Sequence, residues 1–166
     1  PPLAAISIDR RAVLDAALAR QAAADAALAA PLDVRAVTEV ASVAHLEAVA
    51  DAHAGCVLAL VLHARSCGTC KALVAQLASL AASAEYPGVV FLKHDVRDAF
   101  DEATDLSRLH RVRSTPTLLL FRGGAAVRRG ALADSRVGVP AAPGAREGGV
   151  RAWLRVALAE ARGDGG

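Results

Sequence analysis

The sequence has no methionine and few aromatic residues. None of the 166 residues is methionine, and Phe, Tyr and Trp together make up only 3% of the chain. A chain without methionine is not an unprocessed translation product, so we expect removal of an initiator before Pro1, loss of a longer targeting peptide, or a start further upstream. Hydrophobic residues still reach 54%, largely because alanine is abundant, and this bias is typical of a GC-rich genome.

Long apolar runs, many cysteines and an excess of one charge are also missing. No apolar run approaches the roughly 20 residues that cross a bilayer, so we expect a soluble, intracellular protein without a transmembrane segment. Nineteen basic and 17 acidic residues are too evenly balanced to favour a nucleic acid or an anionic membrane as partner. Three cysteines do not make a secreted disulfide scaffold, and they suit a protein whose thiols cycle.

The chain is organised around the segment from Cys56 to Cys70. The seven apolar residues Cys56 to Leu62 are too few to span a membrane and too continuous for a strand with one wet face. They therefore predict a central strand that is covered on both faces. The strand ends at His63, and a short turn brings Cys67-Gly68-Thr69-Cys70 to the start of a helix with periodic apolar residues.

A thiol at the start of a helix has a distinct chemistry. It faces unpaired backbone N–H groups and the positive end of the helix dipole, and both favour the thiolate. Cys67 is therefore the candidate nucleophile, and Cys70 lies one turn later, within reach for a disulfide. Two other interpretations remain open: a zinc half-site in which His63 joins the two cysteines, and two inert buried cysteines.

Periodicity and turn residues predict the other elements. We expect helices at 9–30, 42–54, 99–110 and 150–162, strands at 33–40, 89–92, 118–121 and 125–127, and a flexible loop at 131–149. Strands that alternate with helices imply parallel pairing, and the final hairpin adds an antiparallel edge. The domains predicted are a helical extension over 1–32, a folded domain over 33–162 and a disordered tail over 163–166.

Two motifs carry a resemblance to a known family. The sequence Cys67-Gly68-Thr69-Cys70-Lys71 after an apolar strand, together with Arg113-Ser114-Thr115-Pro116-Thr117 before the next strand, resembles thioredoxin. The resemblance implies the α/β thioredoxin fold, a mixed central sheet flanked by helices, here with an appended N-terminal helix. It also implies that no metal or organic cofactor is needed. By the same resemblance, Cys67 attacks and Cys70 resolves, Pro116 is cis, and substrate binds at Ser66, Gly68, Thr69, Thr115 and Pro116.

The chain departs from the family pattern around this motif. Ser66 and Thr69 stand where typical thioredoxins have tryptophan and proline, and Val61 stands where they bury an aspartate beside the second cysteine. Without that carboxylate we expect no proton acceptor at this place and slow resolution by Cys70. These departures resemble atypical, partner-restricted thioredoxin-like proteins of plant and algal plastids, and suggest a chloroplast location by analogy.

Other residues of types that often carry chemistry have simpler interpretations. His63 and His94 are expected to be strand-end residues rather than catalytic bases, because neither has a partner at fixed spacing. Cys56 is expected to behave as a small hydrophobic residue. Trp153, the single tryptophan, is expected to anchor the last helix to the core.

Two classes of function follow. The first is a protein-disulfide reductase that works through the Cys67/Cys70 pair and needs protein disulfide substrates and an upstream thiol reductant. The second is a thioredoxin-fold interaction or scaffold subunit with little turnover, in which the N-terminal helix or the 131–149 loop contacts a stable protein partner.

Overall fold

The computed structural model describes residues 9–16, 18–19, 31–131 and 150–163. The chain divides into two compact units, residues 1–31 and 32–166. In the first unit, residues 10–16 and 18–19 are helical, and Asp9 Oδ1 accepts hydrogen bonds from the backbone N–H groups of Arg11 (3.0 Å) and Ala12 (3.2 Å). This is the helix start that the sequence predicts. The remainder of the helix predicted over 9–30 lies outside the described residues.

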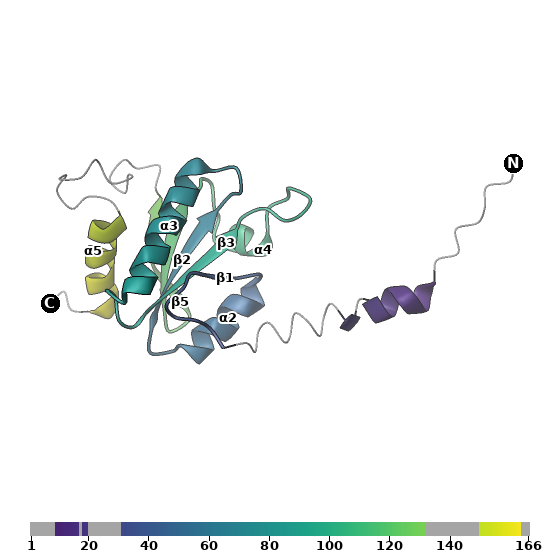
Figure 1. The fold of residues 1–166 in the computed structure, drawn as a ribbon, viewed down its shortest axis with the longest axis horizontal. Helices are drawn as coiled ribbons and strands as arrows, with labels where there is room; N and C mark the ends of the chain where they lie inside the picture. The colour runs from purple at the N-terminus through teal and green to yellow at the C-terminus, as the bar shows by residue number, and fades with distance from the viewer. Residues whose placement is uncertain (1–8, 17, 20–30, 132–149, 164–166) are drawn as a thin grey trace, which may run out of the picture. The chain divides into compact units, whose positions relative to one another are not determined.

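The second unit is built on a five-stranded mixed sheet (Figure 1). Its strands are β1 (Thr38–Glu39), β2 (Val57–His63), β3 (Val89–Asp95), β4 (Thr117–Arg122) and β5 (Ala125–Ala131), in the order β1-β3-β2-β4-β5. β1, β3 and β2 pair in parallel, whereas β4 is antiparallel to both β2 and β5. The central β2 strand and the antiparallel final hairpin are as expected from the sequence.

Helices cover both faces of this sheet and divide the core into two layers (Figure 1). The helices are α2 (Val43–Ala52), α3 (Gly68–Ser83), α4 (Asp105–Leu109) and α5 (Val150–Arg162). Alternate residues of a strand point to opposite faces, so Val57, Ala59 and Val61 pack with α3 and α5. The residues between them, Leu58, Leu60 and Leu62, pack with α2 and α4. Among the described residues, no helix is long and apolar enough to cross a membrane.

The strand predicted over 33–40 is mostly a turn, so this prediction is wrong. Only Thr38–Glu39 pair with β3, and Val34 is exposed. Asp33 explains the difference, because its carboxylate accepts a hydrogen bond from Arg35 N (2.9 Å) and its carbonyl accepts one from Ala36 N (3.1 Å). Such local side-chain bonds give the backbone an alternative to a sheet ladder.

The helix predicted over 99–110 is also shorter than expected. Only Asp105–Leu109 is helical, and Phe100, which contributes to the apolar spacing of the predicted helix, is 87% exposed. Residues 97–103 form a turn in which Asp98 Oδ1 accepts hydrogen bonds from Phe100 N (2.8 Å) and Glu102 N (2.9 Å). The apolar spacing resembles that of a helix, but the Asp98 carboxylate stabilises a turn instead.

The last helix anchors to the sheet as predicted. Trp153 is partly buried against the core layer under α3 and α5. Its ring lies over Gly130 of β5, where a Cβ atom would approach within 2.7–2.9 Å of three ring atoms. The indole can therefore pack directly on the backbone of β5 only because residue 130 is a glycine. The predicted loop and tail lie largely outside the described residues, at 132–149 and 164–166.

Candidate active site

The two cysteines of the motif form a disulfide at the start of α3. Cys67 is the N-cap residue of this helix, and Cys70 follows in the first turn, with a Cα–Cα distance of 5.2 Å. The backbone N–H of Cys70 donates a hydrogen bond to Cys67 Sγ over 3.1 Å. This N–H group belongs to the helix terminus and lacks an earlier carbonyl partner, so it can stabilise negative charge on the sulfur.

The two cysteines of the disulfide differ in their exposure to solvent. Cys67 is half-buried, whereas Cys70 is only 1% exposed and lies against the core. Thr115 comes close from the loop before β4, and its carbonyl oxygen lies 3.9 Å from Cys67 Sγ. The Thr115–Pro116 peptide bond is cis, and Pro116 is buried. The structure thus brings together Cys67 and Thr115, which are 48 residues apart in the sequence.

A polar cleft adjoins the exposed side of the disulfide. The residues that flank Cys67 in the motif, Ser66, Gly68 and Thr69, are exposed. Ser66 and Thr115 line a cleft of about 440 Å³, and its other lining residues come from the segment before Cys67, the 96–103 turn, α4 and the loop before β4. Ser66 and Thr115, both expected from the family resemblance to bind substrate, therefore share one hollow beside the cysteines.

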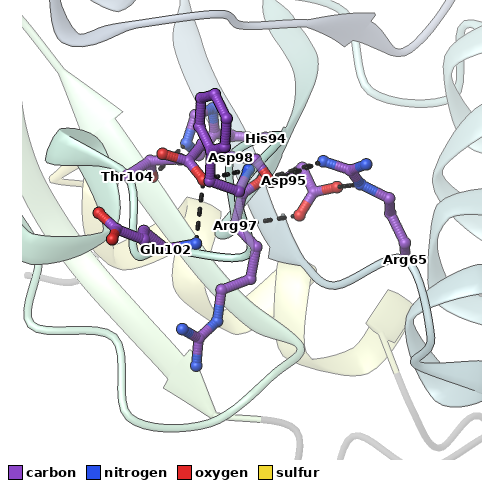
Figure 2. A network of polar contacts seen from close by, with 8 residues as sticks. Arg65, His94, Asp95, Arg97, Asp98, Glu102 and Thr104 are labelled. Carbon is purple, nitrogen blue, oxygen red and sulfur yellow. Dashed lines mark hydrogen bonds and ion pairs between the residues drawn. The ribbon is translucent and has the colours of Figure 1, made fainter. Parts of the chain in front are cut away.

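Arg65 anchors the turn before the motif to the end of β3. Its Nε donates to Asp95 Oδ2 over 2.6 Å, and its Nη2 donates to the carbonyls of Arg97 (3.3 Å) and Asp98 (3.1 Å). Figure 2 shows these residues around the turn that Asp98 organises, with His94 and Thr104 behind it. One guanidinium therefore joins the strand-to-helix turn of the cysteines to a second turn that lines the cleft.

The charge on Asp95 follows from these contacts. Burial raises the pKa of Asp95, but the Arg65 hydrogen bond, the Arg97 N–H at 3.0 Å and the nearby positive charges outweigh it. The pKa of Asp95 therefore lies below its ordinary value, and that of Arg65 lies above its own because of the same hydrogen bond and charge. Both groups are charged at neutral pH.

A second groove lies on the other side, beside the buried cysteine. It measures about 460 Å³ and is lined by His63 from β2, Lys93 from β3, and Cys70 with neighbouring residues of α3. The Nε2 atom of His63 is buried and has no hydrogen-bond partner among the residues that the structure describes. Burial, above all, holds the pKa of His63 below its ordinary value. Val61, at the position where the family resemblance leads one to expect an aspartate, is fully buried in the core.

His94 has a structural role, in contrast to His63. Its Nδ1 lies 2.6 Å from the Val40 carbonyl and its Nε2 lies 2.8 Å from Thr104 Oγ1. Since a carbonyl only accepts, Nδ1 donates, and Nε2 accepts from the Thr104 hydroxyl when the ring is neutral. Both nitrogens are satisfied and the side chain is 3% exposed, so His94 ties β3 to the segments after β1 and before α4.

The remaining cysteine lies apart from the pair. Cys56 is a free thiol just before β2, partly buried against the α2 layer. It contributes to packing, as expected. Within the described ranges, no group of three or more His, Cys, Asp or Glu residues is placed to hold a metal ion.

Two features of this site escape prediction from the sequence. The Arg65–Asp95 pair joins residues 30 apart, and the spacing of neither residue reveals it. His63 has no partner at fixed spacing, so its pattern favours a plain strand end. Strand alternation does contain one signal for His63. It stands two positions after Val61 on the same strand, so its side chain points to the same face, towards the helix that carries Cys70.

Comparisons with known proteins agree with this geometry. The family model described as Thioredoxin matches residues 21–136. The short form of spinach chloroplast thioredoxin f is 23% identical, with a TM-score of 0.57 over 80% of this chain and 99% of that one. Its long form is 25% identical, with a TM-score of 0.57 over 78% and 88% of the two chains.

A thioredoxin from another organism gives a similar match. Fasciola hepatica thioredoxin is 22% identical, with a TM-score of 0.54 over 75% of this chain and 98% of that one. A comparison with curated protein sequences finds no significant match. The family match and the paired cysteines support a thiol–disulfide oxidoreductase, and the expected fold is confirmed. With a family match over more than half of its length, a CxxC pair at the start of α3 and this sheet order, the chain belongs to the thioredoxin family.

Proposed function

We propose that this protein reduces disulfides in other proteins, with Cys67 as the attacking thiol and Cys70 as the resolving thiol. The difference in exposure between the two sulfurs carries the proposal. A partner disulfide can reach half-buried Cys67, whereas Cys70, at 1% exposure, reaches only its neighbour. The N–H of Cys70 at 3.1 Å stabilises the Cys67 thiolate that starts the exchange.

The surface around Cys67 suits an extended peptide. Ser66, Gly68 and Thr69 are exposed on the motif side, and Thr115 faces Cys67 from the other side. An extended substrate that lies between them can hydrogen-bond to the Thr115 backbone, as in other modes of strand addition. Pro116, which follows Thr115 and is buried, has no N–H to donate.

The reducing partner follows from the same chemistry. The oxidised Cys67–Cys70 pair must regain two electrons from an upstream dithiol before each new cycle. Thioredoxin f2, which is 21% identical to this chain with a TM-score of 0.56, has been solved in complex with ferredoxin:thioredoxin reductase. We therefore propose a reductase of this class as the electron donor and the chloroplast as the compartment. Reduction by this enzyme, and not by an NADPH-dependent reductase, tests the donor, and localisation of a tagged full-length chain in cells tests the compartment.

A redox titration followed by turnover tests the main proposal. We expect a reversible two-electron couple in wild type and in Cys56→Ser, the matched control, and multiple turnovers on insulin disulfides with dithiothreitol as donor. Cys67→Ser should abolish turnover, whereas Cys70→Ser should accumulate a mixed disulfide with the substrate. A pair that cycles reversibly but never turns over a protein disulfide would favour the interaction subunit instead.

A further inference from the structure

The resolving step requires that the Cys70 thiol lose its proton, and the proposed function names no group that accepts this proton. The thiolate, not the thiol, attacks a disulfide, so Cys70 must lose its proton before it displaces the substrate from Cys67. Cys70 is almost fully buried, and burial disfavours the charged form. Val61 occupies the position of the carboxylate that assists this proton transfer in the resembling family, and a valine cannot accept a proton. A proton acceptor elsewhere beside Cys70 would speed this step.

The groove beside Cys70 holds such a group. His63 and Val61 are two residues apart on β2, and both face the layer under α3. Cys70 lies in the first turn of α3, and His63, Cys70 and Lys93 line the same groove of about 460 Å³. The groove thus places an imidazole on the same side of the sheet as Val61 and Cys70.

The imidazole is free to accept a proton. Buried polar atoms nearly always have a partner, and exceptions often mark a functional group. His63 Nε2 is such an exception, because it is buried without a hydrogen-bond partner among the described residues. His94, on the neighbouring strand β3, has both ring nitrogens in hydrogen bonds and cannot serve.

We propose that His63 accepts the proton of the Cys70 thiol in the resolving step, in place of the carboxylate that Val61 replaces. This inference rests on the proposed function. In the mixed disulfide, Nε2 takes the proton from Cys70 Sγ, and the thiolate attacks Cys67 Sγ. The Cys67–Cys70 bond forms as the bond from Cys67 to the substrate sulfur breaks. Both cysteines end oxidised, the substrate sulfur leaves reduced with the bonding electron pair, and the imidazolium returns its proton to solvent.

Burial, more than the surrounding charges, favours the neutral ring of His63 before the step. Burial lowers the pKa of His63 most, Asp95 and Glu39 raise it, and Lys93 and His94 lower it. Arg65 and Lys71 add two positive charges at the edge of the groove. A neutral ring at neutral pH is a proton acceptor, and its capacity is lost as the pH falls through the lowered pKa.

Single-turnover kinetics separate the two thiols. Reduced full-length chain in a Cys56→Ser background reacts with 5,5′-dithiobis(2-nitrobenzoate), a small aromatic disulfide. Attack by Cys67 releases one thionitrobenzoate, and resolution by Cys70 releases the second, so stopped-flow absorbance reports both steps. We expect His63→Asn and His63→Gln to slow the second release at least about 10-fold at neutral pH, with the first release changed less than about twofold.

Three readouts distinguish proton acceptance from a structural role. The ratio of wild-type to His63→Asn second-phase rates should peak above the pKa of His63 and fall at lower pH, where the ring is protonated, and at high pH, where Cys70 ionises unaided. Val61→Asp in the His63→Asn background should restore the second release, because it returns a carboxylate to the same face. His53→Asn, a histidine outside the groove, should alter neither phase.

The outcomes are decisive in both directions. Unchanged second release in both His63 variants, or a parallel loss of both releases in folded protein, would overturn the role of His63. Absence of the first release from wild type would instead contradict the proposed function, whatever His63 does.

Discussion

Cys67, Cys70 and Cys56 occupy three different environments. Cys67 is a half-buried helix N-cap whose sulfur accepts a backbone N–H, Cys70 is 1% exposed, and Cys56 is a partly buried thiol before β2. Only the first combines access with stabilisation of the thiolate. The assignment of Cys67 as nucleophile therefore stays a prediction with a definite physical basis.

Alkylation of the reduced chain tests it. At pH 7 and limiting iodoacetamide, we expect Cys67 to be labelled about tenfold or more faster than Cys56, because the reagent reacts with the thiolate. Peptide mapping after short reaction times measures both rates, and urea-unfolded chain supplies the control in which the cysteines should react alike. Faster labelling of Cys56 or Cys70 in the folded chain would contradict the assignment.

Asp95 links the active-site turn to acid stability. Its pKa is lower in the folded chain than in the unfolded one, so its contribution is complete above the ordinary carboxyl pKa near 3.8 and is lost as the pH falls through the lower folded value. We expect Asp95→Asn to lower the free energy of unfolding at pH 7, and the difference from wild type to close below about pH 3.8. Urea unfolding at pH 7, 5 and 3 measures this.

An exposed ion pair gives the matched control. Asp105 pairs with Arg108 at 3.0 Å, but its side chain is 89% exposed, so solvent screens the pair. Asp105→Asn should change the urea midpoint little at any pH. A loss for Asp95→Asn that does not shrink as the pH falls from 7 to 3 would show that the residue acts through packing rather than charge.

At the scale of elements, the contact between β5 and α5 depends on one missing side chain. A Cβ atom at Gly130 would lie 2.7–2.9 Å from the indole of Trp153, closer than van der Waals contact allows. Gly130→Ala should therefore displace the ring and destabilise the fold by about 1–3 kcal/mol, the usual effect of overpacking.

Urea unfolding followed by tryptophan fluorescence measures this effect, since Trp153 is the only tryptophan. Gly55→Ala is the control, because no atom lies within 4 Å of the place that its Cβ would take and its backbone needs no positive φ. It should change the midpoint little. Equal midpoints for Gly130→Ala and wild type would show that α5 adjusts without cost.

The whole chain consists of two compact units, and only the second holds the sheet and the cysteine pair. Leu32 belongs to the second unit and packs against the α2 layer, so it marks a natural first residue. The described large apolar residues of the first unit, Val13, Leu14 and Leu18, are 55–59% exposed. They bury too little surface to contribute much to folding.

A chain that begins at Leu32 should therefore fold without the extension. We expect a single cooperative urea transition with a midpoint close to that of the full chain, and an unchanged rate of thionitrobenzoate release by Cys67. A non-cooperative transition would show that the extension completes the core. The extension as a separate domain is thus a proposal that this experiment decides.

Local patterns in the sequence are enough to predict the central strand, the CxxC helix, the final hairpin and the last helix. The first three depend on short-range properties: continuous apolar residues in β2, helical periodicity after Cys70 and the Gly123-Gly124 turn. The family resemblance added the fold and the pairing of the two motifs in advance, and the match over residues 21–136 confirms the family.

The other features depend on contacts in space, for a physical reason. Asp33 and Asp98 turn segments with strand-like and helix-like patterns into turns, because their carboxylates hydrogen-bond to nearby N–H groups that the pattern does not reveal. The groove that joins His63 and Cys70 arises from the packing of α3 on β2. Which buried nitrogen lacks a partner depends on every neighbour in space, and no spacing along the chain encodes it.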